Sequence, residues 1–228
     1  ACLGCGNGLF KDSAVASFGF GAGAYGLVLG ILSMLFGVHL FLMTGLGALG
    51  FAAFFLRPRT RISWPPKALM VLLTVVVFAA SLDAFAPPTD TDEIYQHLAL
   101  PHQFLMNGTL GGGFLEPDAS RPLPVHMLYT ALVGLGGFAG AKLFHLVLSV
   151  LLILGLWEIA ERRVGKGAGL PATLLLVGSY SFLREMGLAY NNLPAALWCL
   201  LALDQAIADK PKRMAVFSGM ALAAKYTA

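Results

Sequence analysis

The chain has 228 residues, of which 57% are hydrophobic and only 12% are charged, and its mean hydropathy is +0.76. These values lie well outside the range of a soluble domain of this length, so they exclude that class and indicate an integral membrane protein. The net charge of +3 is accounted for by a few basic loops and implies no nucleic-acid partner.

The first hydrophobic block runs from Ala14 to Leu56 without a charged residue. Its length predicts two transmembrane helices of about 20 residues each, and it is too long for a signal peptide. The series Gly19-x-Gly21-x-Gly23 within it favours close helix packing over a nucleotide loop, because no strand precedes it. Further uncharged runs, each near the length of one span or slightly short, cover 68–82, 122–141, 143–157, 167–183 and 186–203.

Basic residues mark the connections that we expect in the cytoplasm, because short loops rich in Lys and Arg stay on that side. They form three groups, which are Arg57, Arg59, Arg61 and Lys67, then Arg162, Arg163 and Lys166, then Lys210, Lys212 and Arg213. The loop 87–121 instead carries Asp90, Asp92, Glu93, Glu116 and Asp118 against Arg121. We therefore predict a multi-pass protein of the plasma or inner membrane whose loop 87–121 faces outside.

This orientation requires the segment 124–160 to make one net crossing. We predict that 124–140 is a helix lying in or dipping into the outer interface, followed by a span over 141–160. Two crossings are the alternative, and they would place Arg162 and Arg163 outside. The predicted spans are roughly 16–35, 38–56, 67–86, 141–160, 167–183, 190–208 and 213–228. The predicted fold class is all-α, a polytopic transmembrane helical bundle whose outer loop carries interfacial helices.

The acidic loop itself is predicted to contain a short amphipathic helix on the membrane surface. Its apolar residues repeat at intervals of three and four, and its polar residues occupy other directions. The apolar set is Ile94, Leu98, Pro101 and Leu105, and the polar set is Glu93, Gln96, His97 and Gln103. Pro101 should end or kink the first part of this helix, because its ring removes a backbone donor.

The predicted topology brings several polar residues to the same outer face as the acidic loop. They are Arg184, Glu185, Tyr190, Asn191, Asn192, Lys225 and Tyr226. Ionisable groups at such depth tend to line a cavity or to pair with a charged group, for which a lipid phosphate is one candidate. In the alternative reading, Arg184 and Glu185 are a solvated turn and Lys225 extends its ammonium to the surface.

A series of motifs over 82–228 resembles one known family in its order and spacing. The series contains Asp92-Glu93 with Tyr95 and His97, Leu100-Pro101, Gly108, Pro122-Leu123-Pro124, Leu128-Tyr129, Ala141-Lys142-Leu143 with His145, Ala160-Glu161-Arg162-Arg163, Ala189-Tyr190-Asn191-Asn192-Leu193-Pro194 and Ala223-Ala224-Lys225-Tyr226-Thr227-Ala228. It is similar to the polytopic lipid-linked sugar transferases of the GT-C class, in the bacterial branch that resembles the protein O-mannosyltransferases.

The resemblance implies a GT-C-like fold and a polyprenyl-phosphate sugar as donor lipid. It implies that Asp92 is the catalytic carboxylate, with Glu93 beside it, and that the reaction inverts the anomeric centre. A carboxylate can take the proton from an acceptor hydroxyl as that hydroxyl attacks. The acceptor is left open as a glycan, a lipid or a protein. The residues expected to bind substrate are His97, His102, Arg121, Arg184, Tyr190, Asn192 and Lys225.

Two features leave the details of the site open. Related sequences often have an Asp where this chain has Asn192, and an amide can hold a hydroxyl but cannot act as a base. Asp90-x-Asp92 could hold a divalent cation through its oxygens, but a turn or helix cap is the favoured role of Asp90. The metal is therefore left unassigned. A haem or quinone site is disfavoured, because His39 and His145 lack a supporting pattern.

The main alternative function is a transporter or flippase for a lipid-linked or small polar substrate, and a non-catalytic membrane scaffold is a third. A transporter would line a path through the bilayer with polar residues, often within internal repeats, and no convincing repeat is present. We divide the chain into 1–66, a pair of transmembrane helices with a basic loop, and 67–228, the first part of a catalytic membrane domain with the acidic outer loop 87–123. Because the chain stops within an apparent span, we expect it to be a fragment.

Overall fold

The computed structural model describes residues 13–55, 64–110 and 124–225 of the chain. Within these ranges the regular structure is helical and contains no β-strand, which confirms the predicted all-α class. The helices are α2 (Ala14–Phe36), α3 (Leu40–Phe55), α4 (Lys67–Phe85), the π-helix η1 (Glu93–Leu98), α5 (Ala99–Asn107), α6 (Pro124–Arg163), α7 (Gly169–Val177), α8 (Tyr180–Met186), α9 (Asn192–Ile207) and α10 (Pro211–Ala224).

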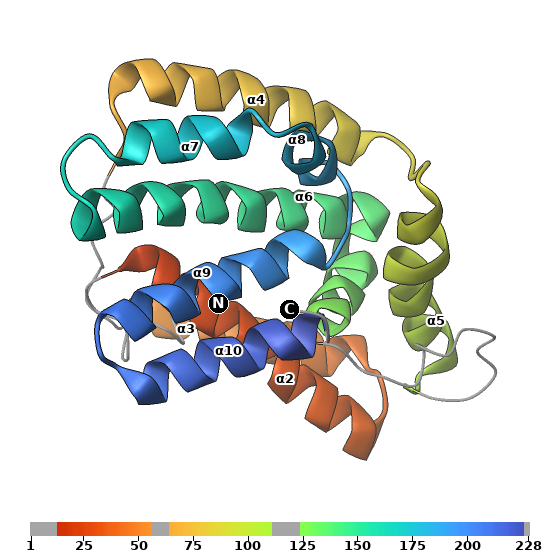
Figure 1. Ribbon diagram of the computed structural model, residues 1–228. Coiled ribbons are helices and arrows are strands. Elements are labelled where there is room, and N and C mark those ends of the chain that lie inside the picture. The colour runs from red at the N-terminus through yellow and green to blue at the C-terminus, as the bar shows by residue number, and fades with distance from the viewer. Residues whose placement is uncertain (1–12, 56–63, 111–123, 226–228) are drawn as a thin grey trace.

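The long helix α6 forms the centre of the bundle. It packs against α2, α4, α5, α7 and α9, and α9 packs closely against α10. Figure 1 shows α4 and α7 on one side of α6, and α9 and α10 on the other. The main core, which includes Leu148, Trp198 and Phe217, therefore lies between α6 and the helices around it.

Glycines on α2 allow it to pack closely against the later helices, as the sequence predicted for this block. At Gly19 an added Cβ would meet the side chain of Leu201, and the Gly19 carbonyl accepts a hydrogen bond from Trp198 Nε1 at 2.9 Å. At Gly26 a Cβ would meet the backbone of Pro124. These contacts join the first predicted span to α9 and to the start of α6.

Three described helices, α2, α4 and α6, are long and apolar enough to cross a membrane. The outer face of α4 is strongly apolar, since Val71, Val75, Phe78 and Leu82 are 59–66% exposed. Such a large exposed apolar face is suited to lipid contact. The structure thus supports the membrane character that the composition predicts.

The remaining predicted spans correspond to shorter helices. The spans 38–56, 190–208 and 213–228 fall on α3, α9 and α10, and the span 167–183 is divided between α7 and α8 by a break at Gly178 and Ser179. The complete set of crossings stays a prediction.

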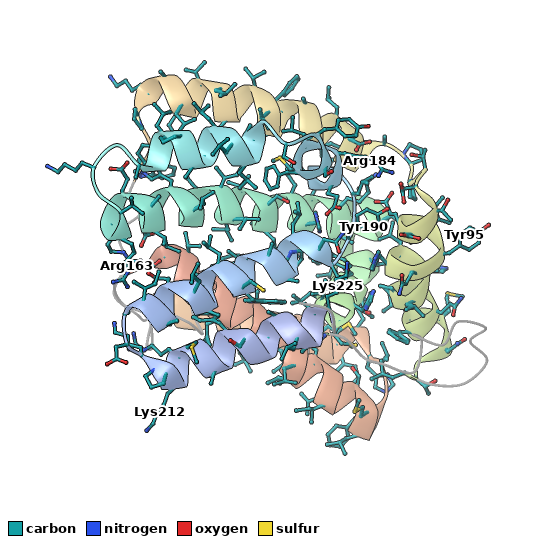
Figure 2. The ribbon with its side chains drawn as sticks, viewed as in Figure 1. Tyr95, Arg163, Arg184, Tyr190, Lys212 and Lys225 are labelled. Carbon is teal, nitrogen blue, oxygen red and sulfur yellow. The ribbon has the colours of Figure 1, made fainter. Side chains whose placement is uncertain are left out.

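The described helices place two kinds of polar residue at opposite ends of the bundle. Arg163 and Lys212 lie at one end, whereas Arg184, Tyr190 and Lys225 lie at the other (Figure 2). We call the first the basic end and the second the polar end. The separation agrees with the predicted grouping of the loops, while the side of the membrane that each end faces stays a prediction.

Helix α6 is broken near its start, where the sequence predicts a change from an interfacial helix to a span. Gly136 and Gly137 have non-helical backbone angles, and Gly137 has φ of +64°, which favours glycine. The part before the break is more deeply buried than a surface helix, because each residue of 124–131 is buried in the bundle. Its contacts with α2 and α5 account for this burial.

The helix of the acidic loop is present, but its buried face differs from the predicted one. Glu93 and His97 are buried together with Leu98 and Pro101, whereas Ile94 is 39% exposed. The cause is the π-helical turn. It has more residues per turn than an α-helix, so the side chains before it are rotated relative to those after it. Pro101 explains the change of helix type, since its ring lacks an N–H and clashes with the preceding turn.

A second, smaller core joins the N-terminal helix pair to the acidic loop. It contains Leu29, Val38, Met43, Leu100, Phe104, Met127 and Ala131. In addition, the backbone N–H of Val38 donates to the carbonyl of Gly108 at 2.7 Å. The turn between α2 and α3 is therefore bonded to the end of α5.

Candidate active site at the polar end

The polar end gathers polar and ionisable side chains from four parts of the chain. The acidic segment contributes Asp90, Glu93 and His97, α6 contributes His126, Tyr129, Lys142 and His145, the region of α8 and α9 contributes Arg184, Tyr190 and Asn192, and the end of α10 contributes Lys225. We call this set the polar cluster.

Asp90 binds neighbouring side chains through both of its carboxylate oxygens. It accepts hydrogen bonds from the Tyr190 hydroxyl and from Arg184 Nη2, and its Oδ1 also accepts from the backbone N–H of Asp92 at 3.2 Å. The bond from Tyr190, assisted by that N–H and by Arg184, lowers the pKa of Asp90. The turn role favoured from the sequence is present, and the contacts with Arg184 and Tyr190 add to it.

Tyr190 stays protonated in this arrangement. Burial raises the pKa of its hydroxyl, and the hydrogen bond to the Asp90 carboxylate raises it further. The hydroxyl is therefore a hydrogen-bond donor at neutral pH and holds Asp90 in its ionised form.

Asp92 and Glu93 have opposite environments although they are adjacent. Asp92 is exposed, and its carboxylate makes no hydrogen bond or ion pair with the described residues. Its charge nevertheless acts on the Tyr190 hydroxyl, which places it beside the polar cluster. An exposed, unengaged carboxylate is available to an incoming hydroxyl.

Glu93 is completely buried and joins three elements. Its Oε1 accepts from the backbone N–H of Ala189 at 2.9 Å and lies 3.7 Å from Lys142 Nζ. Lys142 is also buried, and its ammonium donates to the carbonyl of Ala86 at 3.0 Å. Desolvation raises the pKa of Glu93, with the Ala189 N–H and Lys142 opposing it. Glu93 therefore has a structural role, because its ion pair with Lys142 links η1 to α6.

His97 and His126 form a stacked pair. Their rings lie 5.2 Å apart at 14°, and His97 Nδ1 is 3.0 Å from His126 Nε2. The rings of Tyr190 and His97 also contact each other in an edge-to-face arrangement, at 5.2 Å between ring centroids. Burial, followed by the charges of His126, His145 and Lys225, lowers the pKa of His97 to about 2. His97 is therefore neutral at physiological pH.

Tyr129 connects α6 to the loop before α9. Its hydroxyl donates to the carbonyl of Tyr190 at 2.5 Å and lies 2.7 Å from His145 Nδ1. A hydroxyl has one proton to donate, so His145 must donate its Nδ1 proton to the Tyr129 oxygen. The main chain of Tyr190 is thereby fixed from the interior while its side chain holds Asp90.

Lys225 reaches the polar cluster through Asn192. Its Nζ donates to Asn192 Oδ1 at 2.6 Å, and Asn192 Nδ2 donates to Glu185 Oε1 at 3.0 Å. Asn191 Nδ2 donates to the carbonyl of Ala224 at 2.9 Å, which fixes the end of α10. Asn192 thus uses both halves of its amide, consistent with the hydrogen-bonding role that its residue type predicts.

The structure brings together most of the predicted site residues. Glu93, His97, Arg184, Tyr190, Asn192 and Lys225 belong to the polar cluster. His102 does not, because it is exposed on α5 and contacts the ring of Phe138 in an edge-to-face arrangement. Arg121 lies outside the described residues.

Sequence reasoning assigned no role to Lys142, His126, Tyr129 or His145, and all four are on α6. The signal for Lys142 was available, because a lysine in a long apolar stretch has to find a partner. The histidines and the tyrosine gave no comparable signal, since their partners come from η1 and from the loop before α9.

The described residues include no group of three or more His, Cys, Asp or Glu side chains that could hold a metal ion. Asp90 and Asp92 are the pair singled out by the sequence, and the carboxylate of Asp90 already binds Arg184 and Tyr190.

The comparisons with known proteins identify no relative. No family model matches the chain, and searches of curated proteins and of solved structures gave no match. Function must therefore be argued from the polar cluster itself.

Proposed function

We propose that this chain belongs to a membrane glycosyltransferase that moves a sugar from a polyprenyl-phosphate donor to an acceptor hydroxyl, with inversion at the anomeric carbon. The observation that carries the proposal is the exposed carboxylate of Asp92 beside the polar cluster, whose cationic side chains lie at one end of an apolar bundle. A GT-C-like fold and an outward-facing polar end are parts of the same proposal.

Asp92 is the proposed general base. Its carboxylate takes the proton of the acceptor hydroxyl as the hydroxyl oxygen forms its bond to the anomeric carbon. The bond between that carbon and the phosphate oxygen breaks on the opposite face, and the polyprenyl phosphate leaves with the bonding electrons. Asp92 suits this role better than Asp90, because the pKa of Asp90 is lowered by its contacts with Tyr190 and Arg184.

Lys225 and Arg184 are the proposed partners of the leaving phosphate. Each presents a cation at the polar end, and each is positioned by a neighbour, Asn192 for Lys225 and Asp90 for Arg184. Fixed cations stabilise charge that develops on a leaving group. Arg121 is a third predicted cation.

The distribution of polar groups along α6 favours this enzyme over a transporter. Between His145 and Glu158 the sequence of α6 is apolar except for Ser149, whose hydroxyl donates to the carbonyl of His145. A transport path would need polar groups at the middle of the membrane.

The test uses membranes that contain the complete protein and a panel of labelled polyprenyl-phosphate sugars. Asp92→Asn removes the base but keeps the shape, and we expect transfer to fall roughly 100-fold or more. Asp209→Asn is the matched control, because Asp209 is an exposed aspartate near the basic end. Unchanged transfer in Asp92→Asn would remove Asp92 from the mechanism, and flux without transfer in the wild type would favour a transporter or flippase.

A further inference from the structure

A series of hydrogen bonds leads from the buried first part of α6 to the acidic segment at the surface. The Tyr129 hydroxyl donates to the carbonyl of Tyr190 at 2.5 Å, and the Tyr190 hydroxyl donates to Asp90 Oδ1. The same carboxylate oxygen accepts from the backbone N–H of Asp92 at 3.2 Å. The series therefore ends at the main chain of the residue that we assign as the general base.

The direction of the Tyr129 hydroxyl is fixed from both sides. Tyr129 and His145 are completely buried, and the hydroxyl oxygen lies 2.7 Å from His145 Nδ1. Because the hydroxyl proton is used at the Tyr190 carbonyl, the oxygen accepts the Nδ1 proton of His145. Tyr129 lies before the break in α6 and His145 after it, so this contact also joins the two segments of the helix.

The loop that carries Tyr190 depends on side chains for its position. Ala189 and Tyr190 are buried and belong to no helix. Glu93 Oε1 accepts from the N–H of Ala189 at 2.9 Å, and Tyr129 donates to the carbonyl of Tyr190. Buried main-chain groups outside regular structure need such partners. The place of the Tyr190 ring is therefore set by groups on η1 and α6.

Tyr25 makes the same kind of hydrogen bond in a purely structural setting. Its hydroxyl donates to the carbonyl of Met43 at 2.6 Å and joins α2 to α3 at the second core. Tyr129 differs because the residue that it holds carries the hydroxyl that binds Asp90.

We propose that Tyr129 is a positioning residue of the sugar transfer: it fixes the main chain of Tyr190, so that the Tyr190 hydroxyl holds Asp90 and the segment that carries Asp92. This inference rests on the proposed function, in which Asp92 is the base. A small displacement of a catalytic group lowers the rate steeply, even when the displaced group still binds nothing new.

The kinetic test uses membranes with the complete protein and labelled polyprenyl-phosphate sugar. Tyr129→Phe should lower kcat about tenfold and change the KM for the donor by less than about twofold, because Tyr129 orients the base and does not bind the donor. Tyr190→Phe removes the next bond of the series. If Tyr129 acts through Tyr190, the double variant is no slower than the slower single variant. Losses that multiply, or an unchanged kcat in Tyr129→Phe, would overturn the proposal.

Tyr25→Phe is the matched control, since it removes a hydroxyl bonded to a main-chain carbonyl between other helices. Its kcat should stay within about twofold of the wild type. A loss equal to that of Tyr129→Phe would trace both effects to general loosening of the bundle and would overturn the positioning role.

A second measurement does not depend on transfer. A nitroxide spin label is attached to Asp92→Cys in a background without Cys2, Cys5 and Cys199, and its mobility is read by electron paramagnetic resonance. Adding Tyr129→Phe should increase the mobility, whereas adding Tyr25→Phe should not. Unchanged mobility with Tyr129→Phe would overturn the positioning role whatever the rates. Increased mobility in a protein whose wild type transfers no sugar would reject the proposed function and still support the positioning of the segment.

Discussion

Asp90 and Glu93 belong to one short segment, yet the protein shifts their pKa values in opposite directions. Hydrogen bonding to Tyr190 lowers the pKa of Asp90, and burial raises that of Glu93. Neighbouring acids with such different environments are typical of sites where proton transfer and charge stabilisation are divided between residues. Asp92 lies between them in the sequence and remains exposed, which is why we assign the base to it.

The buried pair of Glu93 and Lys142 leads to a stability prediction. Lys142→Met removes the cation and leaves a buried carboxylate with less compensation, so we expect a loss of about 3 kcal/mol in the free energy of unfolding. Adding Glu93→Gln should recover part of this loss, because the uncompensated charge is then also removed. Chemical unfolding of both variants in detergent is the measurement. A double variant less stable than Lys142→Met would contradict the assignment of an ion pair.

The His97 pair predicts how stability changes with pH. The folded-state pKa of about 2 lies below the ordinary value of 6.5, so the unfolded chain binds more protons between these values. The stabilisation is fully present above pH 6.5 and is lost as the pH falls below it, by at most about 1.4 kcal/mol per pH unit. His97→Gln removes this titration.

Thermal unfolding at about pH 7.5 and about pH 5 tests the prediction. The melting temperature of the wild type should fall more on acidification than that of His97→Gln. Groups that do not contact His97 titrate equally in both proteins, so the difference between the two slopes reports His97 together with its coupling to His126 and His145. Equal slopes would mean that His97 is accessible to protons in the folded state.

At the scale of elements, the order and approximate limits of most helices follow from the sequence. Uncharged runs and basic connections predict where α2, α4 and the long part of α6 begin and end, because these signals are local. The burial of Glu93 and His97 could not be read in the same way. It depends on the π-helical turn before Pro101 and on partners in α6, which only the folded chain brings close.

The break in α6 gives a prediction with an internal control. Gly137 has φ of +64°, whereas Gly136 has φ of −141°, and an added Cβ would meet no atom within 4 Å at either position. Backbone strain is therefore the main difference between them. We expect Gly137→Ala to lower the free energy of unfolding by about 1–2 kcal/mol and Gly136→Ala to change it by less than about 0.5 kcal/mol.

Unfolding of the two glycine variants under identical conditions is the measurement. If the two variants are equally stable, the backbone of α6 can form the break without a positive φ at residue 137. In that case the separation of α6 into two segments would not depend on glycine.

At the scale of the whole molecule, the separation of basic and polar ends predicts the accessibility of inserted cysteines. Met106 on α5 and Val164 after α6 are 73% and 80% exposed and belong to opposite ends. In a background without Cys2, Cys5 and Cys199, an impermeant thiol reagent added to intact cells should label Met106→Cys. It should label Val164→Cys only after the membrane is permeabilised.

The alternative topology gives a different pattern of labelling. If 124–160 crossed the membrane twice, both cysteines would react in intact cells. Labelling of Val164→Cys alone would reverse the orientation and place the polar end in the cytoplasm, where the proposed donor lipid would have to be presented on the inner leaflet.

The hydrogen bond from Val38 to Gly108 also constrains the order of assembly. The turn between α2 and α3 is synthesised well before α5, so the Val38 N–H must be hydrated by water until Gly108 has been made and delivered to the same surface. The first helix pair is made early, but it reaches its final packing only after α4 and α5 have followed. A ribosome paused between these segments would therefore leave an intermediate whose second core is still incomplete.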